Sequence, residues 1–365
     1  MRRVLLLLCA CLLLAGFAWP DVADMLGKRL VAPGGTSPIL PTARIERSIA
    51  QLPHRQGWVE TSAGVRVFWR TFDPGAYRLD YAYRPDGTQR GRMQFDLDAH
   101  APTPYPGTPR GTVVLLHGWM MDGGSLLPWS LQLAQAGYRT ISLDLRNHGR
   151  SGTAPSGYGL REAHDVADAI AALRARGEVV GPLHLLGVSY GAATAIFSAR
   201  ELGLQVDNVI AIESFDNAGG AIRDMVPHML SKPPENVSQR ISHRLLRMRM
   251  DEGALDRAIA SASDTLQLRL DRVDVGAALA QVPSCVLLLH GREDRHVPVA
   301  HGRALAAAAP RAHYIEVAGE DHISLPMRLD LLAPTVIDWL DNADPARTSC
   351  PTPLALSPPP RPHHA

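Results

Sequence analysis

Ser189 stands in the sequence context that a catalytic nucleophile requires. It is the middle residue of G-V-S-Y-G at 187–191, between a short apolar run and a stretch of small residues with helical character. The glycines of this pattern permit a tight turn from strand to helix, where a Cβ at either position would collide with neighbouring backbone. Because such a turn pushes the serine hydroxyl toward solvent, we predict that Ser189 is a nucleophile.

A serine hydroxyl is weakly nucleophilic until a general base within hydrogen-bond reach takes its proton. Histidine suits this task near neutral pH, and a carboxylate behind the histidine fixes its tautomer and stabilises the imidazolium. His322 lies in G-E-D-H at 319–322, and Asp294 lies in G-R-E-D-R-H-V-P at 291–298. The chain therefore holds both kinds of partner that Ser189 needs.

The segments that must position these residues alternate between short β-rich runs and helical stretches, such as the amphipathic segment at 161–176. The apolar runs are 112–116, 138–143, 183–186, 206–212, 285–290 and 314–317. This alternation predicts an α/β fold, with a mostly parallel sheet and helices on both faces. Ligands bind at the carboxyl ends of such strands, so the loops after them are expected to carry the chemistry. Ahead of them, residues 58–99 alternate polar and apolar residues between turn signals, which predicts antiparallel strands.

Five of the loops that follow these strands carry motifs in a recognisable order. The motifs are HG at 117–118, DLRNHGRS at 144–151, GVSYG at 187–191, GREDRHVP at 291–298 and GEDH at 319–322. From about residue 111 to residue 340 the chain resembles the α/β-hydrolase superfamily, in its branch of serine esterases and monoacylglycerol lipases. It departs from the family pattern at Asn147, where glycine is usual in a loop that is normally structural.

The resemblance implies a catalytic triad in the family order, with Ser189 as nucleophile, Asp294 as orienting acid and His322 as base. It also implies that the backbone N–H groups of Trp119 and Tyr190 form the oxyanion hole, which stabilises the charge on the attacked carbonyl oxygen. No cofactor and no metal ion is expected.

Other titratable residues leave alternatives open. Glu213 and Asp216 follow the run 206–212, where some family members place the triad acid. His296 and His301 would suggest a metal site with Asp294, but no further carboxylate or cysteine completes the ligand set, so we expect structural histidines. Four more residues are expected to stabilise loops rather than to catalyse, namely His117, Asp144, His148 and Asp321.

Composition and the first residues bear on partners and compartment. The 37 basic and 36 acidic side chains leave no basic surplus that would indicate a nucleic-acid partner. The four cysteines do not form a recognisable disulfide framework. Arg2 and Arg3 precede an apolar run at 4–18, shorter than a spanning helix usually needs. We predict an exported protein, periplasmic or secreted, with a cleaved signal peptide or an uncleaved anchor that associates with the membrane.

The chain divides into parts of different composition. The expected parts are a leader at 1–18, a linker or loosely docked arm at 19–57, an α/β-hydrolase domain at 58–341 with a helical cap insertion at about 217–281, and a disordered proline-rich tail at 342–365. Within the cap, residues 238–250 have a helical apolar pattern. A surface excursion without a role in substrate selection would occupy the same position.

These patterns favour a serine hydrolase that cleaves an ester or related acyl bond of a small-molecule substrate through an acyl-enzyme. An aminopeptidase, a thioesterase or an acyltransferase of the same fold would use the same triad. A non-catalytic binding protein on this fold would have no need of Ser189, Asp294 and His322 together. Serine at position 189 argues against the family members that use aspartate as nucleophile.

Overall fold

The structure is a computed structural model, and it describes seven stretches of the chain. These are residues 22–32, 42–84, 92–97, 102–231, 253–309, 311–342 and 349–356. The expected leader at 1–18 and the expected cap helix at 238–250 lie outside the described residues. None of the helices within the seven stretches is long and apolar enough to cross a membrane.

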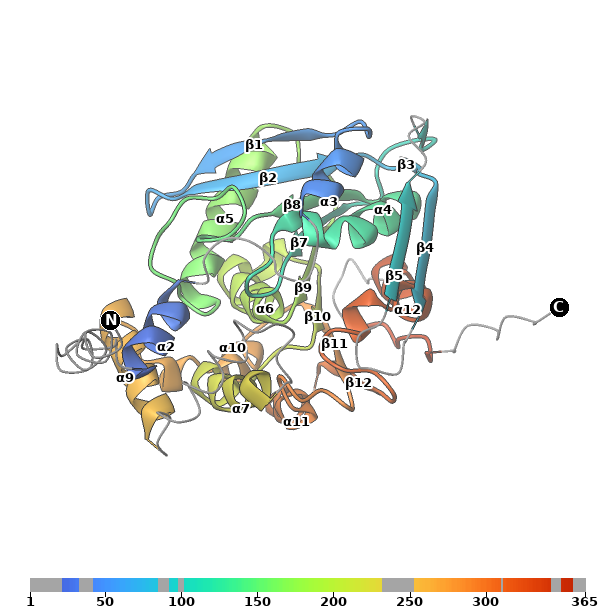
Figure 1. The fold of residues 1–365 in the computed structure, drawn as a ribbon. Helices are drawn as coiled ribbons and strands as arrows, with labels where there is room; N and C mark the ends of the chain where they lie inside the picture. The colour runs from blue at the N-terminus through green and yellow to red at the C-terminus, as the bar shows by residue number, and fades with distance from the viewer. Residues whose placement is uncertain are drawn as a thin grey trace, which may run out of the picture.

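An eight-stranded sheet forms the centre of the molecule (Figure 1). In spatial order its strands are β1 (Arg55–Glu60), β2 (Arg66–Phe72), β8 (Arg139–Leu143), β7 (Thr112–Leu116), β9 (Leu183–Val188), β10 (Asn208–Ile212), β11 (Cys285–Gly291) and β12 (His313–Val317). β2 pairs antiparallel with both β1 and β8, whereas the other neighbouring pairs are parallel. The predicted mostly parallel sheet with an antiparallel start is confirmed.

Helices cover both faces of the sheet because successive strand residues point to opposite sides. In β7, Val114 and Leu116 belong to one core cluster, and Val113 and Leu115 belong to a second. The first cluster lies under α5 (Leu160–Ala175), α6 (Tyr190–Leu202), α10 (Val275–Leu279) and α11 (Val299–Ala308), and the second under α4 (Leu127–Gln135) and α12 (Leu329–Asp341). Burial on both faces explains why these strands are continuous apolar runs in the sequence.

The predicted antiparallel strands divide between two places. β1 and β2 extend the main sheet, whereas β4 (Leu79–Arg84) and β5 (Arg92–Leu97) form a separate two-stranded sheet. β3 (Gly75–Ala76) and β6 (Thr103–Pro104) form another. Short 3₁₀ turns complete the described connections, at η1 (Gly123–Leu126), η2 (Gly203–Gln205), η3 (Leu270–Arg272) and η4 (Leu325–Met327).

The segment expected to be a linker or a loosely docked arm at 19–57 contains two packed helices and the start of β1. α2 (Val22–Val31) lies on α9 (Ala254–Leu266), and its Leu30 carbonyl accepts a hydrogen bond of 2.7 Å from the Tyr158 hydroxyl. α3 (Thr42–Ile49) buries Ile49 against Phe72 in a third core cluster. The apolar faces of these helices are short and flank a proline- and glycine-rich sequence, so the sequence pattern does not indicate them. This part of the chain is therefore more closely packed than expected.

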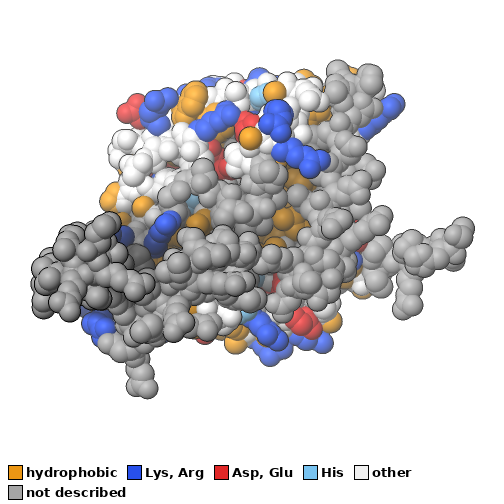
Figure 2. Space-filling view, viewed as in Figure 1, with side chains coloured by type: hydrophobic (Ala, Val, Ile, Leu, Met, Phe, Trp, Pro, Cys, Tyr) orange, Lys and Arg blue, Asp and Glu red, His pale blue; other side chains and the backbone are white. Residues whose placement is uncertain are grey.

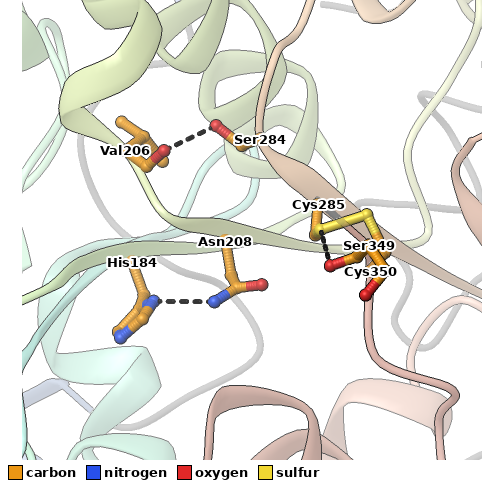
Figure 3. The surroundings of a disulfide bond; sticks show 7 residues. All are labelled: His184, Val206, Asn208, Ser284, Cys285, Ser349 and Cys350. Atoms are coloured by element: carbon orange, nitrogen blue, oxygen red, sulfur yellow. Dashed lines mark hydrogen bonds between the residues drawn. A yellow bond between two sulfur atoms is a disulfide. The ribbon is translucent and has the colours of Figure 1, made fainter. Parts of the chain in front are cut away.

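Within the expected disordered tail at 342–365, the described residues 349–356 also differ from the expectation. Cys350 forms a disulfide with Cys285, the first residue of β11, across a sequence separation of 65 residues (Figure 3). Nearby, the Thr335 hydroxyl of α12 donates a hydrogen bond of 3.3 Å to the carbonyl of Leu354. Two cysteines so far apart form no local pattern, which is why the sequence did not indicate this bond.

The expected cap at 217–281 contains α7 (Ala218–Ser231), α9, η3 and α10 within the described residues. Arg223 of α7 forms ion pairs with Asp256 of α9 and Asp271 of η3, which ties these elements together. Val275 and Leu279 of α10, like Ile222 of α7 and Ile259 of α9, are buried in the same cluster as residues of α6. The described part of the predicted insertion therefore packs on the main core.

Charged side chains of both signs are interspersed over the described part of the face shown in Figure 2. Several exposed arginines are held by acidic neighbours, as Arg55 is by Asp73 and Glu178.

Candidate active site

The turn that carries Ser189 joins β9 to α6 and has a strained backbone. Ser189 has φ 54° and ψ −114°, and its N–H donates a hydrogen bond of 2.8 Å to the carbonyl of Ile212. A Cβ on Gly187 would collide with the Gly191 carbonyl, and a Cβ on Gly191 would collide with the carbonyl of Leu116. Non-glycine residues rarely adopt such a positive φ, and strain of this kind is concentrated at functional sites.

Three side chains from distant loops meet at this turn. The Ser189 hydroxyl lies 2.9 Å from Nε2 of His322, and Nδ1 of His322 lies 2.7 Å from Oδ2 of Asp294. Asp294 follows β11 and His322 follows β12, so parallel pairing of the strands brings their loops to one edge of the sheet. The structure thus brings together the three residues that the sequence analysis singled out.

Asp294 is held in place by its own loop. Its Oδ1 accepts hydrogen bonds from the backbone N–H groups of His296 at 2.7 Å and Val297 at 2.9 Å, which leaves Oδ2 for His322. Burial disfavours the carboxylate, but the nearby imidazole of His322 and the surrounding hydrogen bonds outweigh burial and hold the pKa of Asp294 well below its usual range. Asp294 is therefore ionised at neutral pH.

The pKa of His322 moves in the opposite direction. Burial of the ring would lower it, but the carboxyl groups of Asp294 and Glu213 together more than offset burial and raise the pKa of His322 above its ordinary value. A raised pKa makes His322 a stronger acceptor for the Ser189 proton. Because Asp294 accepts at Nδ1, the neutral ring has its free lone pair on Nε2, the atom that faces Ser189.

The predicted oxyanion donors lie beside Ser189. Tyr190 is the first residue of α6, where backbone N–H groups have no acceptor within the helix. The loop that carries Trp119 passes close to the serine, since a Cβ on Gly118 would lie 3.7 Å from the Ser189 Cβ. The Trp119 ring stacks on Tyr158 at 5.2 Å and contacts Tyr190 at 4.9 Å. These ring contacts fix the loop against the start of α6.

A second carboxyl group, Glu213, also reaches His322. Glu213 is fully buried just after β10, and its Oε2 lies 3.0 Å from Nδ1 of His322. Its Oε1 accepts a hydrogen bond of 3.0 Å from the N–H of Gly291. The sequence presented Glu213 as an alternative to Asp294, and the structure places both beside the same imidazole. A carboxylate directly after a parallel strand was the available signal.

Asp216, the other alternative acid, is engaged elsewhere. It contacts Nδ1 of His301, whose Nε2 lies 3.0 Å from Oδ2 of Asp224 on α7. Within the described stretches, the residues spaced to hold a metal ion are Glu213, His290 and Asp294, and two of these are the carboxyl groups beside His322.

The residues expected to stabilise loops do so in the structure. His117 is buried, and its Nε2 accepts a hydrogen bond of 3.0 Å from the Leu145 N–H. Burial lowers the pKa of His117 to about 4, so it stays neutral. Asp144 accepts hydrogen bonds of 2.7 Å from the N–H groups of Gly123 and Arg150. Asp321 likewise accepts from the N–H of Ser324 at 2.9 Å.

Asn147, which replaces the usual glycine, fits the left-handed conformation that this position requires. Its φ is 66°, and asparagine adopts this region more readily than most residues. Its side chain accepts a hydrogen bond of 2.9 Å from the Ala154 N–H and donates one of 3.0 Å to Ser156. The substitution is therefore compatible with the loop.

The chain matches a family model and several known proteins over most of its length. A model of the alpha/beta hydrolase family matches residues 113–360. The chain is 25% identical over 255 residues to the uncharacterized protein YqkD of Bacillus subtilis, covering 68% of this chain and 76% of that one. It is 27% identical over 252 residues to a pimeloyl-[acyl-carrier protein] methyl ester esterase of Xanthomonas oryzae, covering 63% and 91%.

Solved structures show the same fold. The esterase Pf2001 of Pyrococcus furiosus superposes with a TM-score of 0.53 at 15% identity, covering 85% of this chain and 96% of that one. The family match spans more than half of the chain and includes the β7 to α12 region that builds the site. This protein belongs to the alpha/beta hydrolase family.

Proposed function

We propose that this hydrolase cleaves an ester or related acyl bond through an acyl-enzyme formed on Ser189. The observation that carries the proposal is the chain of contacts from Ser189 Oγ to His322 Nε2 at 2.9 Å and from His322 Nδ1 to Asp294 at 2.7 Å. A serine on a strained turn, a base within reach and an acid behind the base are the parts that acyl transfer needs.

In this mechanism His322 takes the Ser189 proton as Oγ attacks the carbonyl carbon. The Asp294 carboxylate stabilises the imidazolium, and the N–H groups of Tyr190 and Trp119 stabilise the oxyanion. His322 then protonates the leaving alcohol, and the carbon–oxygen bond breaks to leave the acyl group on Ser189. Water, deprotonated by His322, then attacks the acyl carbon. His322 returns this proton to Ser189 Oγ as the bond between Oγ and the acyl carbon breaks, which releases the acid and restores the serine.

Labelling with a fluorophosphonate probe tests this proposal, because the probe reacts with activated serines. We expect the parent protein to be labelled, and Ser189→Ala and His322→Ala to lose labelling. Ser198→Ala is the matched control, since Ser198 lies in α6 and donates only to the Thr194 carbonyl. A folded parent that is not labelled, or labelling that persists in Ser189→Ala, contradicts the proposal.

Substrate panels then separate the activities that share this triad. We propose carboxylester cleavage as the main activity, supported by the methyl ester esterase among the relatives. Matched p-nitrophenyl esters, thioesters and aminoacyl anilides with the same acyl group compare the three bond types directly. A higher kcat/KM on anilides than on esters would favour an aminopeptidase instead.

We also propose that the protein is exported, as the basic and apolar leader indicates. The Cys285–Cys350 disulfide supports this, because such bonds persist in oxidising compartments and are rare in the cytosol. Cell fractionation, together with the mass of the mature N-terminus, tests it. A cytosolic protein that retains its leader and has free thiols at both positions contradicts export.

A further inference from the structure

We propose that Glu213 is a second acid for His322, one that positions the imidazole together with Asp294 and sustains turnover when the Asp294 carboxylate is removed. This inference rests on the proposed triad, and it adds a positioning residue to it. The observation behind it is that two carboxyl groups, from loops after β10 and β11, converge on Nδ1 of one histidine.

The geometry allows either carboxyl group to accept the proton of Nδ1. Asp294 Oδ2 lies 2.7 Å from Nδ1 and Glu213 Oε2 lies 3.0 Å from it. Nδ1 carries one hydrogen, so only one of the two carboxyl groups can form a well-aligned hydrogen bond with it at a time. Asp294 is closer and therefore the better placed. Besides His322, the buried Oε2 of Glu213 has only the Asp294 carboxyl group as a hydrogen-bonding neighbour within the described structure. It is therefore free to accept from Nδ1 when Asp294 does not.

Glu213 is held in this position by its backbone and by the neighbouring strand. Its φ is 60°, in the region that non-glycine residues seldom adopt. Its N–H donates to the Leu289 carbonyl at 2.8 Å, and its Oε1 accepts from the Gly291 N–H at 3.0 Å. Both partners belong to β11, the strand that leads to Asp294. The two acids are thus fixed relative to each other.

The two carboxyl groups differ in charge because their surroundings differ. Asp294 receives two backbone N–H groups and is ionised. Burial, followed by the neighbouring Asp294, raises the pKa of Glu213 to about 7. Below that pH Glu213 holds a proton, and its neutral carboxyl group lies beside the Asp294–His322 pair. Removing the Asp294 charge removes one of the causes of the raised pKa, so Glu213 ionises more readily and replaces the lost carboxylate.

Three other titratable side chains lie near Glu213 and Asp294, and each has partners other than His322. His290 on β11 has its Nε2 3.4 Å from Asp294 Oδ2 and 2.8 Å from the Val297 carbonyl. Tyr314 on β12 interacts electrostatically with Glu213. Glu320, whose carbonyl lies near Gly291, is ion-paired with Arg328. Within the described stretches, none of these three side chains forms a hydrogen bond with His322, whereas both Glu213 and Asp294 face Nδ1.

A purely structural role for Glu213 would consist of accepting the Gly291 N–H. Glu213→Gln separates the two roles, because the amide oxygen keeps that bond while the amide NH₂ takes the place of the neutral carboxyl group beside Asp294. The variant therefore resembles the protonated acid and cannot ionise. Thermal unfolding by circular dichroism shows whether each variant folds.

The experiment compares four proteins: the parent, Glu213→Gln, Asp294→Asn and the double variant. The readout is kcat/KM for p-nitrophenyl acetate from pH 5 to 10. Loss of the orienting acid in a triad typically costs about 10⁴-fold. We expect Asp294→Asn to lose only about 10²-fold above pH 7, where Glu213 is ionised, and the double variant to lose the full ~10⁴-fold. Glu213→Gln alone should remain within about 10-fold of the parent.

The pH profile gives a readout that a structural role would not move. In the parent, ionised Glu213 adds a negative charge beside His322, so removing it should shift the acid limb of kcat/KM to lower pH by about one pH unit. Nitrogen NMR of the His322 ring should show the same shift in its titration. In Asp294→Asn, activity should rise with pH as Glu213 ionises, and this rise should be absent from the double variant.

The outcomes separate this inference from the proposed function. Suppose that the parent is labelled by the probe. If Asp294→Asn is then as inactive as the double variant, or if Glu213→Gln leaves the pH profile unchanged, the inference about Glu213 is overturned and the triad stands. If the folded parent is not labelled by a fluorophosphonate, the triad fails and the inference fails with it.

Discussion

Gly191 lies so close to the carbonyl oxygen of Leu116 that no side chain fits between them. This contact joins the first turn of α6 to the end of β7, the strand that leads into the loop of Trp119. Ser189 and the expected oxyanion donor Trp119 are therefore held in relation to each other by one backbone contact.

Gly191→Ala should abolish fluorophosphonate labelling, because the added Cβ forces α6 away from β7 and displaces Ser189. Overpacking of this kind typically costs about 1–3 kcal/mol of unfolding free energy. Gly220→Ala is the control, since a Cβ there has no neighbour closer than 3.6 Å. Denaturant unfolding and labelling rates measure both effects. Normal labelling of Gly191→Ala would show that the contact is not needed.

Activity should fall in acid with a midpoint above the ordinary histidine value near 6.5. The sign follows from the raised pKa of His322, since only the neutral ring accepts the Ser189 proton and protonation persists to higher pH when the pKa is raised. The pH dependence of kcat/KM on a neutral ester measures this midpoint. A midpoint below 6 would contradict a base held beside the Asp294 carboxylate.

Reduction of the Cys285–Cys350 disulfide should lower stability with little effect on activity. In the chain-entropy account, a loop of this length contributes about 4 kcal/mol. Cys285 begins β11, at the end of the strand away from Asp294, so the site is far from the change. Urea unfolding of the parent with and without reductant, beside the double serine variant, measures the loss. Equal stability of all three would contradict this prediction.

Arg146→Ala should destabilise the fold strongly, by about 3–5 kcal/mol, because it leaves a buried carboxylate without its partner. Arg146 donates to Asp165 at 2.7 Å and to the Pro155 carbonyl at 2.9 Å, and both side chains of the ion pair are buried. Arg303→Ala is the control, because the ion pair of Arg303 with Glu316 is exposed and contributes little. Urea midpoints that fall equally in both variants would contradict the expected difference in stability between losing the buried ion pair and losing the exposed one.

Several features follow from the sequence because they depend on local patterns. The apolar runs predict the parallel strands to within a few residues, and the run at 161–176 predicts α5 at Leu160–Ala175. The glycines around Ser189 predict its turn, since only a missing Cβ permits the approach of Gly191 to Leu116. The loops that carry Asp294 and His322 could likewise be expected at one edge of the sheet, because parallel strands end on the same side.

Other features depend on contacts between residues far apart in the chain. The helix α2 and the Cys285–Cys350 bond lie in segments whose composition predicts a linker and a disordered tail. A short helix is stable only through the surface it packs on, and two cysteines 65 residues apart pair only if the fold brings them together.

The sequence by itself indicated the family, and it predicted Ser189 as the nucleophile and the set of acids that could serve His322. Only the tertiary structure decided that Glu213 and Asp294 share the same imidazole, at 3.0 Å and 2.7 Å, while Asp216 pairs with His301. The reason is physical: residue type and spacing fix which chemistry a loop offers, but the direction of a side chain at the end of a strand depends on the backbone conformation and on the strands beside it.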